Sequence, residues 1–193
     1  MEKLHRRDLM TLEAYAEARP RFRARIMAHK KDRRVAIGDH ASLYFEDRLT
    51  IQYQVQEMLR AEKIFAAAAI DEELAVYNPL IPDGGNWKAT FMLEYPNREE
   101  RLRRCRELVG IEDRVWVRVG DGERLFAIAD EDLPRATDEK TSTVHFLRFE
   151  LRVGERMAVA AGAPVRMGID HADYRCEVTL ADAVRRSLSG DLG

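Results

Sequence analysis

The sequence has little of what a metal, disulfide or membrane protein needs. Among its 193 residues there are only two cysteines, Cys105 and Cys176, and neither belongs to a CxxC pair or a cysteine–histidine cluster. We therefore expect both to be small core-type residues, and we expect no zinc or iron–sulfur cofactor made by this chain alone. No apolar run is long enough for a signal peptide or a membrane span, so we expect a soluble cytoplasmic protein without a membrane partner.

Two further absences narrow the function. No GxGxxG or GxxxxGK[ST] loop is present, so a nucleotide held by a glycine-rich loop is not expected. The 32 basic and 34 acidic side chains nearly cancel, so no overall field attracts nucleic acid. The basic run of residues 19–34 spreads its charges around a helix, with Phe22, Ile26 and His29 on a narrow apolar stripe. We interpret it as a solvated helix, with nucleic-acid binding as the less favoured alternative because no interleaved aromatic residues offer a stacking platform.

The 46% of hydrophobic residues can build one sizeable core, and we expect one globular domain over residues 1–193. Residues 1–32 predict a helical N-terminal arm of two helices, with Pro20 in the first turn of the second. In the body, residues 33–193, strands follow one another through hairpins while helices occur in separate blocks. This arrangement predicts an α+β fold with a largely antiparallel, curved sheet and helices packed on it.

The stretch from residue 45 to residue 63 predicts an amphipathic helix with charges in its apolar arc. Arg48 and Glu62 fall on the same side as the apolar residues, and Gln52 borders them. A buried unpaired charge costs several kcal/mol of stability. Either Arg48 and Glu62 pair with charged groups of other elements, or their head groups reach water. We expect this helix to pack on one face of the sheet, with Arg48 and Gln52 bonded to polar groups there. We expect Asp170 to be the partner of Arg48 and His145 to lie in the same pocket.

Two places in the predicted strands carry side chains that can bind a metal or transfer a proton. Alternation in residues 141–151 puts His145 among inward apolar neighbours, which favours a hydrogen-bonded core histidine over a ligand or an acid–base group. The segment "GIDHADYR" gathers Asp170, His171 and Tyr174 at a strand end. It is typical of a polar turn, although the same residues could bind a metal or relay a proton.

The sequence resembles a bacterial domain-of-unknown-function family, number 3501, over nearly its whole length. The resemblance is carried by "LEAYAEARPRFRARIMAHKKDRRVAIGDHASLYFEDRLTIQYQVQEMLRAEKI", "YNPLIPDGGNWKATFMLEY", "DRVWVRVGD", "AIADEDLPRATDEKTSTVHFLRFEL" and "GIDHADYR". It implies genes encoded beside a rubrerythrin-like protein and an iron–sulfur oxidoreductase of the heterodisulfide-reductase type. This context implies a role in redox or peroxide-stress metabolism. The chain is not itself a rubrerythrin, since it lacks the paired Glu-x-x-His helices of a di-iron bundle.

Two functional hypotheses follow. The leading one is an accessory protein that binds a redox partner protein and holds no cofactor of its own; self-association is left open. The alternative is a small enzyme or metal-binding protein with a polar cleft at which the helix and the strand ends meet. The candidate cleft residues are Arg48, Gln52, Glu57, His145, Asp170, His171 and Tyr174. A single divalent metal ion would take its ligands from Glu62, His145, Asp170 and His171.

Overall fold

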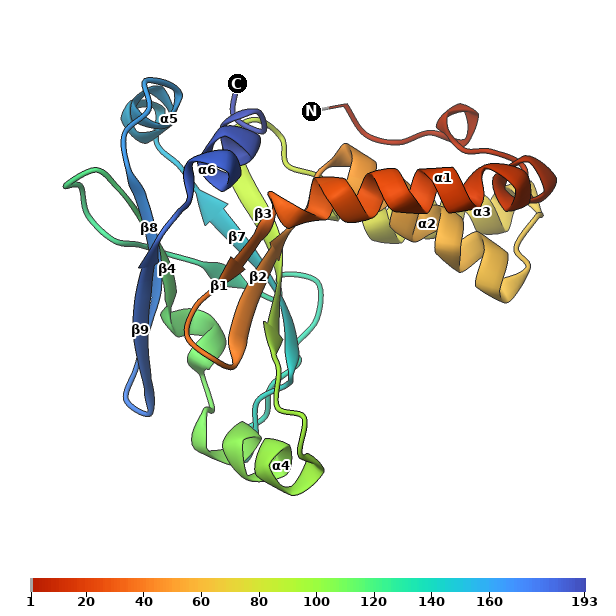
Figure 1. Cartoon of the computed structure of the whole chain (residues 1–193). Helices are drawn as coiled ribbons and strands as arrows, with labels where there is room; N and C mark the ends of the chain where they lie inside the picture. Colours follow the sequence, from red (N-terminus) through yellow and green to blue (C-terminus); the bar gives the residue numbers. More distant parts are fainter. Residues whose placement is uncertain (1) are drawn as a thin grey trace.

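The computed structural model describes residues 2–193 and confirms the α+β class (Figure 1). The α-helices are α1 (Leu12–Lys31), α2 (Arg48–Glu62), α3 (Ala67–Tyr77), α4 (Arg98–Glu107), α5 (Val153–Ala160) and α6 (Asp182–Ser189). Short 3-10 turns are η1 (Arg6–Asp8), η2 (Asn78–Leu80) and η3 (Ile111–Arg114). The strands are β1 (Arg34–Ala36), β2 (Ala41–Phe45), β3 (Asn86–Leu93), β4 (Val115–Val119), β5 (Leu125–Phe126), β6 (Ile128–Ala129), β7 (Val144–Glu150), β8 (Val165–His171) and β9 (Tyr174–Thr179).

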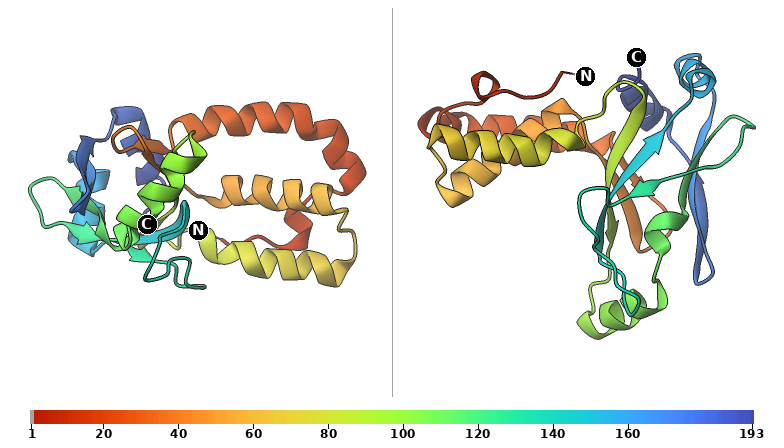
Figure 2. Two further views of the ribbon diagram at one scale, coloured as in Figure 1. Left: turned by 90° about the horizontal axis from the view of Figure 1, so that it is seen from below. Right: turned by 180° about the vertical axis from the view of Figure 1, so that it is seen from behind.

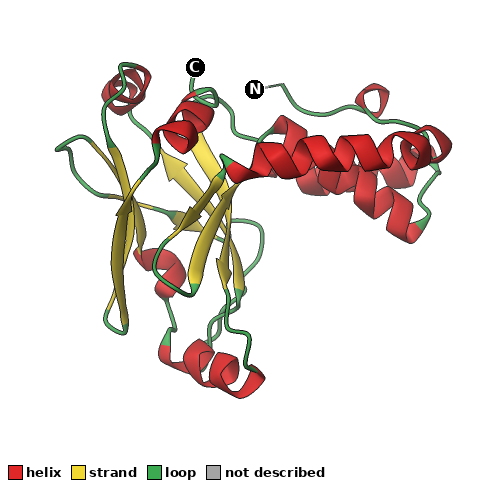
Figure 3. Ribbon diagram, in the orientation of Figure 1, coloured by secondary structure: helices red, strands yellow, loops and turns green. Residues whose placement is uncertain are grey.

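The strands form two antiparallel sheets instead of one (Figure 3). One sheet has the order β1-β2-β3-β7-β6 and the other the order β5-β4-β8-β9. The segment from β5 to β6 is divided between the two sheets, because β5 pairs with β4 whereas β6 pairs with β7. Between them, the buried Ala127 donates its backbone N–H to the Val115 carbonyl oxygen at 2.8 Å. This segment therefore connects the two sheets at their shared edge.

The main core lies between the two sheets. Inward side chains such as Leu43, Phe91 and Phe149 come from one sheet, and Val117 and Met167 come from the other. Helices α5 and α6 contribute buried residues at one end of this core. The predicted alternation of β7 is confirmed, because its odd-numbered residues from 145 to 149 are buried and its even-numbered residues are more exposed.

Helices α1, α2 and α3 form a separate layer that extends sideways from the sheets, with α2 between the other two (Figures 1 and 2). The buried face of α2 contacts this layer: Ile51, Val55 and Leu59 pack with apolar residues of α3 and the N-terminal segment. On another side of α2, Tyr53 packs with α1. The expectation that α2 packs on the sheet is wrong, because its apolar surface is covered by neighbouring helices.

Helix α1 is one continuous helix, so the expected break at Pro20 is also wrong. Thr11 caps its start by accepting a hydrogen bond from the Ala14 backbone N–H. Tyr15, Phe22 and Ile26 form one buried stripe along it. Packing along this whole stripe offsets the loss of the one backbone hydrogen bond that Pro20 cannot donate.

Arg33 joins the helical layer to the sheets. Its side chain is 2% exposed and forms a two-pronged ion pair with Asp191, with Nη1 3.3 Å from Oδ1. It also donates to the carbonyl oxygens of Phe45 and Glu46 and lies 3.5 Å from Asp47, the N-cap of α2. One guanidinium therefore connects the start of β1, the start of α2 and the C-terminal segment.

Candidate functional site

Arg48 and Gln52 are partly buried and bonded, as expected, but to different partners than expected. Arg48 Nη2 lies 2.8 Å from Asp8 Oδ2, and Gln52 Nε2 donates to the Asp8 carbonyl oxygen at 2.6 Å. The prediction that Arg48 pairs with Asp170 of the sheet is wrong, because Asp170 pairs with Arg124. Residues on adjacent turns of one helix can be satisfied by one approaching segment, and here that segment is η1.

Glu57 belongs to the contact between α1 and α2. Its carboxylate accepts two hydrogen bonds from Arg19, at 2.7 and 2.8 Å, and one from the Tyr15 hydroxyl at 2.6 Å. The hydrogen bonds from Arg19 are the main reason that the pKa of Glu57 falls to about 2. Glu62, at the end of the same helix, is exposed.

Asp170, His171 and Tyr174 lie at the β8–β9 hairpin, which is the polar turn that the sequence favours. Asp170 is exposed and pairs with Arg124 and, more weakly, Arg175. His171 Nε2 donates to the Val109 carbonyl oxygen, while its Nδ1 accepts from the Asp173 backbone N–H, so both ring nitrogens are occupied. The Tyr174 hydroxyl donates to the Ile37 carbonyl oxygen at 2.7 Å.

His145 is a hydrogen-bonded core residue with no exposed surface, as predicted. Its Nδ1 lies 2.6 Å from Asp130 Oδ2, and its Nε2 lies 2.8 Å from Thr141 Oγ1 and 3.1 Å from the Ser142 carbonyl oxygen. A carboxylate only accepts, so Nδ1 donates to Asp130, and the Thr141 hydroxyl that contacts Nε2 also lies 3.0 Å from Glu112 Oε2. This network is satisfied internally and fixes the end of β7 to the loop that precedes it.

The candidate residues are thus divided among the helical layer, the β8–β9 turn and the core. The four candidate metal ligands do not converge, and no group of three or more histidine, cysteine or acidic side chains in residues 2–193 is arranged to hold a metal ion. None of the helices in that part of the chain is long and apolar enough to cross a bilayer.

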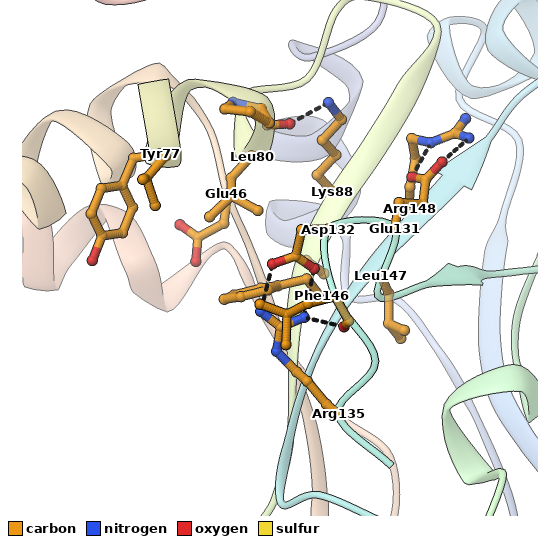
Figure 4. A pocket seen from close by; sticks show the side chains of 14 residues that line it. Glu46, Tyr77, Leu80, Lys88, Glu131, Asp132, Arg135, Phe146, Leu147 and Arg148 are labelled. Atoms are coloured by element: carbon orange, nitrogen blue, oxygen red, sulfur yellow. Dashed lines mark hydrogen bonds and ion pairs between the residues drawn. The ribbon is translucent and has the colours of Figure 1, made fainter. Parts of the chain in front are cut away.

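A groove lies elsewhere, where the helical layer meets the outer face of the five-stranded sheet (Figure 4). Its floor is formed by β3 and β7, one wall by the end of α3 with η2, and the other wall by the loop of residues 130–135. The cavity measures about 340 Å³, within the range of small ligand sites. Its apolar lining residues are Val76, Tyr77, Pro79, Leu80, Ala89, Leu133, Phe146 and Leu147.

Three cations line this groove, and each is already partnered. Arg135 forms a two-pronged pair with Asp132 at 2.6 Å and stacks 4.4 Å from the Phe146 ring centre. Arg148 forms a two-pronged pair with Glu131 at 2.8 Å.

The third cation, Lys88, donates to backbone carbonyl oxygens at the end of the helical layer. Its ammonium group lies 2.5 Å from the Pro79 oxygen and 3.2 Å from the Ile81 oxygen, and Lys3 donates to the same Ile81 oxygen at 3.1 Å. Burial lowers the pKa of Lys88, and the nearby charge of Lys3 lowers it further. Lys88 therefore holds η2 against β3.

The sequence contained part of the signal for this groove. Alternation in β7 puts Val144, Phe146, Arg148 and Glu150 on the face opposite His145, and Phe146 and Arg148 of this set line the groove. The wall at residues 130–135 gave no signal, because an acidic "DEDLPR" segment is typical of any solvated loop.

The chain is an α+β protein with two antiparallel sheets, and its helical layer and five-stranded sheet form a small surface site. The family model for proteins of unknown function, DUF3501, matches residues 3–192, so the chain belongs to this family. A crystal structure titled as a novel protein of unknown function from Burkholderia pseudomallei K96243 is similar, with 51% sequence identity, a TM-score of 0.95 and 100% of each chain covered. No curated protein matches the chain.

Proposed function

We propose that the protein is an accessory component of a bacterial redox or oxidative-stress system and that it binds a partner protein through the groove. The redox setting comes from the genomic context that the family resemblance implies. The groove is the observation that carries the binding role, because it is an apolar site at a junction of two structural units. Both cysteines are free thiols, in keeping with a reducing compartment such as the cytoplasm.

The rim of the groove supports a protein partner. Val76 is 67% exposed and Leu133 is 52% exposed, and both line the same cavity. Exposed apolar side chains that gather around a concave site, surrounded by charged pairs, are typical of binding surfaces. The paired charges of Arg135 and Arg148 would form the polar rim of such an interface.

The test is a direct binding measurement with the two partners that the genomic context names. The purified chain is titrated with the rubrerythrin-like protein and with the iron–sulfur oxidoreductase of the same bacterium, and association is followed by calorimetry. Leu133→Gln should weaken binding by roughly tenfold, because an apolar anchor near the centre of an interface contributes 1 kcal/mol or more.

Leu102→Gln is the matched control, since Leu102 is 49% exposed and lies on α4, outside the groove. This variant should bind as the wild type does. The proposal is wrong if neither protein binds, or if the two leucine variants lose the same affinity.

A further inference from the structure

Glu46 is the acid in the groove that has no cationic partner. Its Oε1 accepts the Thr90 hydroxyl at 3.0 Å and its Oε2 accepts the Thr50 hydroxyl at 2.6 Å. Among residues 2–193, no lysine, arginine or histidine nitrogen lies within 4.0 Å of this carboxylate. A carboxylate can accept about four hydrogen bonds, so two positions are left for a donor.

The surroundings of Glu46 raise the cost of leaving it without a counter-charge. It extends from the end of β2 over the outer face of the sheet, and Figure 4 shows its carboxylate between Tyr77 and Phe146. Apolar walls weaken the screening of its charge by water. The other cations of the groove cannot serve, since Lys88, Arg135 and Arg148 are bound to acceptors of their own.

We infer that the groove receives the side chain of a lysine or arginine from the partner protein, with its alkyl part against the apolar walls and its cationic head on Glu46. A donor fork or an ammonium group fits the two open positions of the carboxylate. The aromatic rings of Tyr77 and Phe146 add a face that attracts cations. The source of the side chain depends on the proposed function, whereas the chemistry of the site does not.

The chemistry is tested with n-butylguanidinium as a probe and n-pentanol as its neutral counterpart. Binding is followed by chemical-shift changes in ¹H–¹⁵N spectra of the full chain, and the perturbed amides should lie around residues 46, 77 and 146. Glu46→Gln removes the charge; its amide oxygen can keep one hydroxyl contact, and its amide nitrogen can donate to the oxygen of the other threonine. It should weaken butylguanidinium binding roughly tenfold, as loss of a charge-assisted hydrogen bond does, and leave pentanol binding unchanged.

Glu94→Gln is the control, because Glu94 also accepts two hydroxyl groups, those of Ser42 and Tyr44, but lies outside the groove. It should not change the affinity for either probe. If butylguanidinium binds through Glu46 and neither candidate partner binds, the proposed function fails and the cation site stands. If a partner binds through Leu133 while butylguanidinium is not bound, or is bound equally by Glu46→Gln, the inference is overturned and the proposed function stands.

Discussion

Gly168 is a residue whose absence of a side chain the packing requires. It pairs across the strands with Trp116, and a Cβ atom there would lie 2.4 Å from Trp116 Cζ2 and 2.7 Å from the Cys176 carbonyl oxygen. A side chain could move aside, but the backbone carbonyl belongs to the neighbouring strand. Gly168→Ala should therefore destabilise the protein by ~1–3 kcal/mol, measured by urea denaturation.

The comparison for this substitution is Gly154→Ala. Gly154 lies in α5, and no atom comes within 4 Å of an added Cβ. Alanine favours helices, so this variant should be unchanged or more stable by ~0.5–1 kcal/mol. Equal effects of the two substitutions would contradict the packing explanation.

Single residues also show what the sequence could predict. Cys105 was expected to be a small core residue, and it is 7% exposed, with burial raising the pKa of its thiol. The core role of His145 was predicted from strand alternation alone. Its partners were not, because Asp130 and Glu112 lie 15 and 33 positions away and no local periodicity connects them.

At the scale of elements, helices and strands were predicted well wherever one face of the element is buried. The sequence predicted the α2 helix and its apolar arc from spacing, and the polar turn between β8 and β9 from its turn residues. It could not predict what covers the arc, since an amphipathic face fits a sheet or a helix equally well. For the same reason we expected Arg48 to lie against the sheet, whereas it pairs with Asp8 of η1.

The contact between α1 and α2 yields a pH prediction. Arg19 lowers the pKa of Glu57 from its ordinary 4.5 to about 2 in the folded protein. A lowered pKa gives stability that is present above 4.5 and is lost as the pH falls through about 2. Glu57→Gln should therefore lose ~1 kcal/mol of unfolding free energy near neutral pH, after solvent screening, and little or none of it at the lowest pH.

The measurement is urea denaturation between about pH 2 and pH 6, with Glu62→Gln as the control on the same helix. Glu62 is exposed, so this variant should follow the wild-type pH profile. A difference between wild type and Glu57→Gln that stays constant over this range would show that the ion pair does not stabilise the helical layer.

At the scale of the whole molecule, the C-terminal segment is held by residues far from it in the sequence. Asp191 pairs with Arg33, the Gly193 backbone N–H donates to the Gly84 carbonyl oxygen, and Trp87 Nε1 donates to the Leu188 carbonyl oxygen at 2.8 Å. These contacts close one end of the sheet core at the point where the helical layer departs. The buried ion pair is their only two-charge contact, so it allows the coupling to be measured.

Arg33→Met should cost ~3–5 kcal/mol, because it leaves Asp191 buried without its cation. Asp191→Leu should also be destabilising, since it leaves Arg33 with Asp47 as its remaining acid. The double variant Arg33→Met/Asp191→Leu should be more stable, by ~1–3 kcal/mol, than the sum of the two single effects predicts. Each single variant leaves one charge of the pair buried without its partner, whereas the double variant removes both charges.

Arg34→Met is the control at the neighbouring position, where the arginine is about half exposed and pairs with Glu94 at the surface. It should cost less than ~1 kcal/mol. Single effects at Arg33 and Asp191 that add within ~0.5 kcal/mol would show that the pair is not coupled. Strong coupling would mean that the C-terminal segment and the helical layer stabilise each other through the Arg33 guanidinium. Loss of the Arg33 or the Asp191 side chain should then also loosen the groove wall that the contact between η2 and Lys88 holds in place.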